Sequence, residues 1–108
     1  MDPRVQDVVS FIRENYRRKL TLREMAATVN LSPWRLGHLF KTHMGTSPER
    51  FLTQVRLDKA KHLLDNSFLS VKEVMGEVGI SDAGYFSRSF KAAYGVSPAK
   101  YRVSGPKP

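Results

Sequence analysis

The sequence predicts an all-α fold in which one structural unit is used twice. Apolar residues recur at helical spacing, residues that favour helix N-caps precede most of these segments, and no segment is a convincing strand. The stretch SPWRLGHLFK at 32–41 also has a counterpart, SDAGYFSRSFK at 81–91, and each is followed by a Gly-x-Ser-Pro turn. We therefore expect about seven helices arranged as two similar units.

The first expected helix begins at Asp2 and Pro3, which suit the N-cap and the first helical position. The basic run 17–19 closes the helix favourably against its dipole. Its apolar residues follow at helical spacing: Val5, Val8, Val9, Ile12 and Tyr16.

A second, short helix is expected to run from Thr21 to about Val29. Thr21 and Glu24 have the spacing of a capping box, in which each side chain bonds the other residue's backbone N–H. Asn30 can adopt the left-handed conformation that ends a helix.

The third helix is expected to begin at Ser32–Pro33 and to end at Gly45. Its inward stripe consists of Leu36, Leu39, Phe40 and His43/Met44. Ser47–Pro48 then begins a longer connecting helix of about 16 residues, roughly 24 Å long. The core face of that helix is expected to contain Phe51, Leu52, Val55, Ala60, Leu63 and Leu64.

The pattern then returns. Ser70 and Glu73 form a second predicted capping box, and Gly79 takes the place of Asn30. Ser81–Asp82 begins a helix that ends at Gly95, with an inward stripe of Phe86, Phe90 and Ala93. A last short helix begins at Ser97–Pro98 and places Tyr101 where Phe51 stood in the first copy.

The two copies can be aligned by residue number. Leu20 matches Leu69 and Ser32 matches Ser81 at an offset of 49, and after one inserted residue Phe40 matches Phe90 at an offset of 50. Two copies are too few for a solenoid. A small three-helix module used twice is the better interpretation.

Composition restricts the possible functions. The 108 residues carry a net charge of +8, and each half of the chain holds nine basic and five acidic residues. Basic surface in both copies attracts polyanions such as nucleic acid, acidic membranes or acidic proteins. The absence of cysteine excludes disulfides and thiolate metal sites, and no run is apolar enough to span a membrane or to serve as a secretion signal.

In each copy a short helix, a tight turn and a second helix follow the layout of a helix-turn-helix. The second helix presents an outward stripe of small, polar and basic residues: Trp34, Gly37, His38 and Lys41 in one copy, and Gly84, Ser87, Arg88 and Lys91 in the other. Such a stripe fits the DNA major groove, although a solvated surface has a similar composition. Core packing is a second possibility for Trp34.

These residues resemble the DNA-binding domain of the AraC/XylS family of bacterial transcription regulators. The resemblance covers about residues 5–102 and is strongest in SVKEVMGEVGISDAGYFSRSFKAAYGVSPAKYR at 70–102 and RLDKAKHLL at 56–64. It implies two homeodomain-like helix-turn-helix subdomains, 1–47 and 67–103, a connecting helix at 48–66 and a frayed tail at 104–108. It also implies that one chain reads two successive major grooves, so that the DNA site need not be palindromic.

Family positions transfer to this chain as expected DNA contacts. The expected base-reading residues are Trp34, Arg35, Gly37, His38, Ala83, Gly84, Tyr85, Ser87 and Arg88. The expected phosphate contacts are Thr21, Lys41, Ser70, Lys91 and Ser97. Gly37 and Gly84 depart from the longer polar residues often found in the family, and Ala83 offers only a methyl group, so Arg88 is the main expected readout of the second copy. Arg56 is expected to pair with Glu77 or Asp82.

The leading hypothesis is therefore sequence-specific binding of double-stranded DNA for transcription regulation, as an activator in the bacterial cytoplasm. The alternative is a basic helical module that binds an anionic protein or membrane surface without reading sequence. An enzyme is not indicated, because no nucleophile, base or phosphate loop is grouped. No cofactor is expected, and zinc at His38 and His43 is disfavoured because they do not share a helical face. Family resemblance also implies RNA polymerase as a partner and a missing N-terminal sensor or dimerisation domain.

Overall fold

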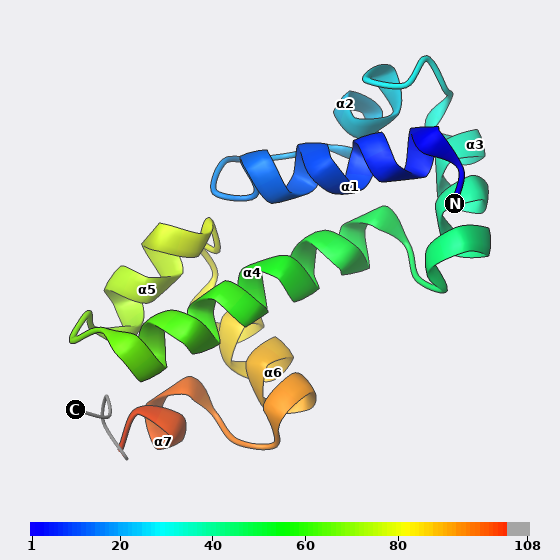
Figure 1. The fold of residues 1–108 in the computed structure, drawn as a ribbon. Coiled ribbons are helices and arrows are strands. Elements are labelled where there is room, and N and C mark those ends of the chain that lie inside the picture. The colour runs from blue at the N-terminus through cyan, green and yellow to red at the C-terminus, as the bar shows by residue number, and fades with distance from the viewer. Residues whose placement is uncertain (104–108) are drawn as a thin grey trace. The chain divides into compact units, whose positions relative to one another are not determined.

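The computed structural model describes residues 1–103, and all the regular structure within that range is α-helical (Figure 1). This confirms the predicted all-α fold. Its helices are α1 Pro3–Asn15, α2 Leu22–Ala27, α3 Pro33–Met44, α4 Pro48–Asn66, α5 Val71–Val78, α6 Ala83–Tyr94 and α7 Pro98–Val103. The predicted tail at 104–108 lies outside the described residues.

The chain divides into two compact units, Met1–Val55 and Arg56–Pro108, here called unit 1 and unit 2. The boundary falls within α4, so this helix contributes its first part to unit 1 and its second part to unit 2. The expected division, with the connecting helix as a segment of its own, stays a prediction.

Unit 1 is built around one apolar core to which all its helices contribute. The buried residues are Val5, Val8 and Ile12 of α1, Met25 and Ala26 of α2, Leu36 and Phe40 of α3, and Leu52 of α4. The rings of Phe40 and Phe51 meet edge to face, with centroids 5.7 Å apart. Removal of this apolar surface from water is the main force that holds the three-helix module together.

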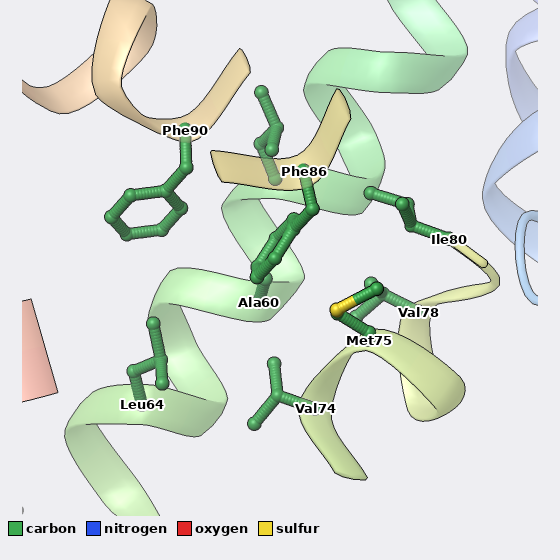
Figure 2. Packing of buried hydrophobic residues seen from close by; sticks show 9 residues of the cluster. Ala60, Leu64, Val74, Met75, Val78, Ile80, Phe86 and Phe90 are labelled. Atoms are coloured by element: carbon green, nitrogen blue, oxygen red, sulfur yellow. The ribbon is translucent and has the colours of Figure 1, made fainter. Parts of the chain in front are cut away.

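Unit 2 repeats this arrangement, as Figure 2 shows, with Phe86 and Phe90 of α6 reaching toward α4 and α5. The remaining buried residues are Leu57, Ala60 and Leu64 of α4, Val74, Met75 and Val78 of α5, and Ile80 of the turn. Two details differ from the prediction: Leu57 joins the core, and Ala93 is exposed.

The second part of α4 packs its buried residues into the core of unit 2, as α1 packs its buried residues into the core of unit 1. Buried residues of α1 stand at positions 5, 8 and 12, and those of α4 at 57, 60 and 64, with the same spacing. Each unit is thus a supporting helix followed by a helix-turn-helix.

The two turns share one backbone hydrogen bond. Leu31 N donates to Ala26 O, and Ile80 N donates to Met75 O, both at 3.0 Å. Asn30 and Gly79 hold the predicted positive φ values of 57° and 81°. Gly79 is the C-cap of α5, whereas α2 ends at Ala27 with Thr28 as its C-cap, earlier than predicted, so Asn30 lies in the turn.

The N-caps of α3 and α6 correct the expected alignment. Ser32 Oγ accepts from Arg35 N at 3.1 Å, whereas in unit 2 it is Asp82 Oδ1 that accepts, from Tyr85 N at 2.9 Å. Ser32 therefore corresponds to Asp82 rather than to Ser81. The inserted residue belongs to the turn before the helix.

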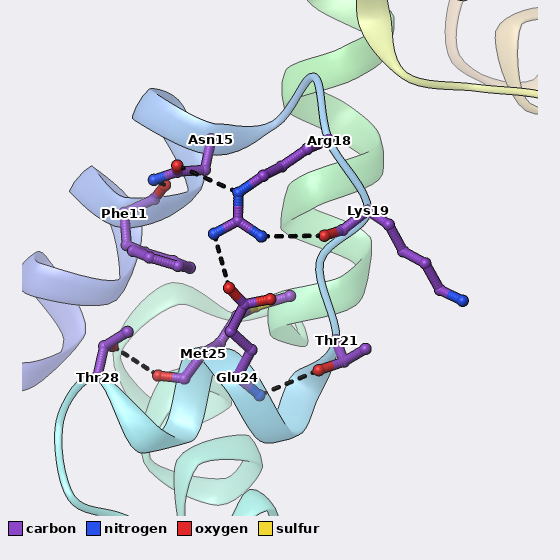
Figure 3. Close-up of polar contacts among 8 residues, drawn as sticks. All are labelled: Phe11, Asn15, Arg18, Lys19, Thr21, Glu24, Met25 and Thr28. Atoms are coloured by element: carbon purple, nitrogen blue, oxygen red, sulfur yellow. Dashed lines mark hydrogen bonds and ion pairs between the residues drawn. The ribbon is translucent and has the colours of Figure 1, made fainter.

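Only one of the two predicted capping boxes is complete. Ser70 and Glu73 bond each other's backbone N–H, at 3.0 and 2.9 Å. In unit 1, Thr21 accepts from Glu24 N at 3.1 Å, but the Glu24 carboxylate turns to Arg18 instead (Figure 3).

Arg18 is the centre of a polar cluster that ties the α1–α2 loop to both helices. Its Nη2 lies 2.6 Å from Glu24 Oε2, and its Nη1 donates to Lys19 O at 3.2 Å. The guanidinium also lies 5.6 Å from the centre of the Phe11 ring. Because α1 ends at Asn15, Arg18 lies in the loop after the helix, and its Nε donates back to Asn15 Oδ1 at 3.4 Å.

Among the helices within residues 1–103, none has both the length and the apolar character needed to cross a membrane.

Candidate nucleic-acid interface

An exposed aromatic ridge runs along α3. Trp34 is 71% exposed, and its ring stacks on that of His38 with centroids 4.1 Å apart and planes tilted by 46°. Positions four apart on a helix are neighbours on its surface, so each ring holds the other in place. The core interpretation of Trp34 is therefore wrong: the indole stands on the outer face of the recognition helix.

Two shallow grooves flank this ridge, and Trp34 and His38 line both of them. The groove on the α2 side has a volume of about 390 Å³ and is completed by Leu22, Pro33, Gly37 and Lys41. The groove on the α1 side has a volume of about 270 Å³ and is completed by Arg4, Leu31, Arg35, Leu39 and Thr42. A basic side chain is thus present on each flank.

This arrangement suits a double-stranded polyanion. An α-helix fills a major groove about 12 Å wide, so a ridge at its outermost edge faces base edges. The flanks of an inserted helix face the two phosphate strands, which Lys and Arg contact. Arg35, which was expected to read bases, lies on the α1-side flank.

In unit 2 the expected readers of α6 are exposed. Ala83, Gly84, Ser87, Arg88 and Lys91 are exposed, and Tyr85 is 41% exposed. The first turn of α6 is therefore less bulky than that of α3, since Gly84 stands where the aligned position of α3 carries Trp34.

Arg56 of α4 is partly buried within unit 2. Desolvation lowers the pKa of its guanidinium, and an electrostatic interaction with Tyr85 opposes that effect. Arg56 therefore interacts electrostatically with Tyr85 in the first turn of α6. Its expected pairing with Glu77 or Asp82 stays a prediction.

The hydroxyl groups expected near phosphates serve first as N-caps. Thr21, Ser70 and Ser97 accept from the backbone N–H of Glu24, Glu73 and Lys100 at 3.1, 3.0 and 3.2 Å. These bonds fix the helix ends, and a phosphate role for the three residues stays a prediction.

Arg4 is the residue of this surface that sequence reasoning missed. It lies almost thirty positions before α3 but lines the groove beside Arg35 because α1 packs against α3. The available signal was the repeated core spacing, which places Arg4 before Val5 as Arg56 precedes Leu57. Within residues 1–103, no group of His, Asp or Glu is arranged to hold a metal ion.

Comparison with known proteins identifies several similar chains. A family model described as a helix-turn-helix domain matches residues 25–104. The raffinose operon transcriptional regulatory protein of Pediococcus pentosaceus is 43% identical over 96 residues, which are 89% of this chain and 35% of that protein. The arabinose operon regulatory protein of Salmonella typhimurium is 36% identical over 104 residues, 95% of this chain and 37% of that protein. This chain thus spans about a third of the length of these relatives.

Two solved structures show the same fold. The C-terminal domain of AraT, a response regulator from Geobacillus stearothermophilus, superposes with a TM-score of 0.91 at 34% identity, covering 99% of this chain and 89% of that one. The DNA-binding domain of AdpA, solved in complex with a target DNA, gives a TM-score of 0.87 at 28% identity, covering 93% of this chain and 90% of that one.

Proposed function

The chain belongs to the AraC family of helix-turn-helix transcription regulators, and we propose that it reads DNA through both units at once. Sequence-specific DNA binding for transcription regulation is the function of this family rather than an enzymatic reaction. In the proposed complex, α3 and α6 enter two successive major grooves of one duplex.

The observation that carries the proposal is the stacked Trp34–His38 ridge with basic residues on both flanks. Exposure of one aromatic side chain is ordinary by itself, and it is the 71% exposed indole in contact with His38 between two basic flanks that points to a partner. Insertion between two phosphate strands uses the aromatic ridge and the basic flanks together.

The residues divide into three proposed roles: base readout, close approach to the DNA and phosphate contact. Trp34, His38, Tyr85, Ser87 and Arg88 are proposed to read base edges, with Arg88 bonding a guanine. Ala83, Gly37 and Gly84 are proposed to allow close approach, with the Ala83 methyl available to a thymine methyl. Arg35 is proposed to contact bases or the adjoining phosphate, and the expected phosphate contacts are Lys41, Lys91, Thr21, Ser70 and Ser97.

Because both recognition helices belong to one chain, the proposed site has no two-fold symmetry. Helix-turn-helix proteins that dimerise read palindromes whose half-sites lie about 34 Å apart, one turn of DNA. Here the two half-sites differ in sequence, since the readers of α3 and α6 differ.

A second part of the proposal concerns a further domain, the partners and the place of action of the regulator. Relatives about three times as long suggest a further sensor or dimerisation domain before this one. A regulator of this family is proposed to contact RNA polymerase, to act as an activator, and to work in the bacterial cytoplasm on the nucleoid.

Selection of bound DNA from a random pool, at two salt concentrations, tests the function. We expect a non-palindromic site with two preferred blocks about 10 base pairs apart. Binding that falls steeply with salt but enriches no sequence would contradict base readout. It would favour instead a basic module that binds anionic surfaces, and vesicles with anionic lipids would then be the next ligand to test.

A further inference from the structure

We propose that Arg4 of α1 contacts a DNA phosphate beside the first recognition helix, and that Asp2 competes with the DNA for it. This inference rests on the proposed DNA-binding function and adds a residue outside the helix-turn-helix to the binding surface. The supporting helix of the unit then has a part in binding as well as in packing.

The position of Arg4 is the first argument. Its side chain is 45% exposed and lines the same groove as Arg35, Thr42 and the Trp34–His38 ridge. When the ridge enters the major groove, the α1-side flank faces one phosphate strand and the Lys41 flank faces the other. Without Arg4, Arg35 would be the one arginine lining the α1-side groove that could contact a phosphate.

Charge is the second argument. Arg4 and Arg35 both line the groove, and no carboxylate lines it. A planar guanidinium binds a phosphate through parallel N–H donors, which makes paired arginines a preferred phosphate site. Asp2 already compensates the charge of Arg4, so a phosphate would add an anionic partner for Arg35 and would compete with Asp2 for Arg4.

Asp2 is the acid next to the groove, and it holds Arg4. Its Oδ2 lies 3.0 Å from Arg4 Nη2, its Oδ1 accepts from Arg4 Nε at 3.3 Å, and Oδ1 also accepts from Arg4 N at 2.8 Å as the N-cap of α1. Hydrogen bonds from Arg4 lower the pKa of Asp2 to about 2, so the carboxylate is charged at neutral pH. A phosphate must compete with it for the guanidinium.

Unit 2 supplies an independent parallel. Arg56 precedes the first buried residue of its supporting helix as Arg4 does, and its electrostatic interaction is with Tyr85. Tyr85 and Arg35 hold the same position, three residues after the N-caps Asp82 and Ser32. Each unit thus places an arginine of the supporting helix near the third residue of the recognition helix.

The test uses the full 108-residue chain and the DNA site selected from the random pool. For Arg4→Gln, we expect the slope of log association constant against log salt to fall in magnitude by about one, because one phosphate fewer is neutralised. Arg13→Gln is the matched control. It removes the same charge at the other end of α1, where Arg13 lies over the Phe51 ring, and should leave the slope unchanged.

A double-mutant cycle with modified DNA locates the contact. Single methylphosphonates, which are uncharged, are placed in turn along the strands that flank the first block of the site. At one position the substitution should weaken binding of the wild-type chain several-fold but have little effect on Arg4→Gln. An unchanged salt slope together with no coupling at any position would overturn the proposal.

Asp2→Ser tests the competition. Serine keeps an oxygen at the N-cap, so α1 should remain folded, but it removes the carboxylate that holds Arg4. DNA binding should tighten in the wild-type background and much less in the Arg4→Gln background. An equal gain in both backgrounds would overturn the competition by Asp2. If the pool yields no preferred site, the proposed function fails first, and that result is distinct from a selected site whose binding ignores Arg4.

Discussion

The guanidinium of Arg88 lies over the backbone of Gly84. A Cβ atom at residue 84 would stand 3.0 Å from Arg88 Nη1, which is tighter than most real Cβ contacts, and 3.4 Å from Asp82 Oδ1. The absence of a side chain at Gly84 therefore lets the expected guanine reader rest against the first turn of its own helix.

Gly84→Ala should separate stability from recognition. Alanine favours the helix by up to about 1 kcal/mol, while its methyl group displaces the Arg88 guanidinium. We expect unchanged or higher thermal stability and a weaker preference at the base pair read by Arg88, measured by unfolding and by DNA selection. Gly76→Ala is the control for the helix effect, since Gly76 lies within α5 and a Cβ there meets nothing within 4 Å. Unchanged base preference in Gly84→Ala would show that the resting position of Arg88 does not matter for readout.

Trp34 provides an intrinsic probe, because it is the single tryptophan of the chain. Its 71% exposure predicts an emission maximum typical of a solvated indole, and insertion into a groove should quench it or shift it to shorter wavelength. Trp34→Ala should weaken specific binding at least ten-fold but change the free energy of unfolding by no more than about 0.5 kcal/mol, as for other surface sites. Emission that does not respond to saturating specific DNA would place the ridge away from the duplex.

The complete capping box of α5 predicts a pH effect on unit 2. The bond from the Ser70 backbone N–H is the main cause that lowers the pKa of Glu73. A carboxylate whose pKa is lowered in the folded state adds stability above its ordinary pKa, and this stability disappears as the pH falls through the folded-state pKa. The stability advantage of the wild-type chain over Glu73→Gln should thus shrink between about pH 6 and pH 3.

Ser70→Ala is the control for that measurement. It removes the side-chain acceptor at the N-cap, at a cost of about 1 kcal/mol, but keeps the backbone donor that makes the larger contribution to the Glu73 shift. Most of the pH dependence should survive in this variant. Identical pH profiles for the wild-type chain and Glu73→Gln would contradict the proposed effect.

Much of this fold could be predicted because its signals are local. N-caps and left-handed turn residues act within three or four positions, and Asp2, Asn30 and Gly79 behave as their residue types suggest. The exposure of Trp34 agrees with its helical phase, since it stands off the stripe of Leu36 and Phe40.

The missed features depend on tertiary packing. α4 gives Leu52 to one core and Leu57 to the other, so no single helical face describes its buried residues. Glu24 has two acceptable donors, the Thr21 N–H of the capping box and the Arg18 guanidinium, and only the folded loop brings Arg18 within 2.6 Å. Arg4 is added to the site by the packing of α1 against α3; the repeated core spacing aligns Arg4 with Arg56 but does not place it beside α3.

Two tyrosines hold the C-terminal part of unit 2 against α4. Tyr101 Oη donates to Asp65 Oδ1 at 2.6 Å, and Tyr94 Oη donates to Asp58 Oδ1 at 2.5 Å. Both rings also meet Phe90 edge to face, with centroids 5.7 and 4.7 Å away. The hydrogen bonds therefore join the end of α6 and the middle of α7 to two residues of α4 that are seven positions apart, on one face of that helix.

Tyr101→Phe should isolate the contribution of one of these bonds. Phenylalanine keeps the ring against Phe90 but loses the donor, and we expect unit 2 to lose up to about 1 kcal/mol in urea unfolding at neutral pH. The bond to Asp65 raises the pKa of Tyr101, so its stabilising effect is complete below the ordinary tyrosine pKa, about 10, and is lost as the pH rises through the folded-state value. The difference in unfolding free energy between wild type and Tyr101→Phe should consequently vanish in strong alkali.

Tyr94→Phe is the comparison variant. Its hydrogen bond is more exposed than that of Tyr101, so the loss of unfolding free energy should be smaller. Equal stability of the wild-type chain and Tyr101→Phe at neutral pH would mean that solvent satisfies Asp65 as well as the phenol does.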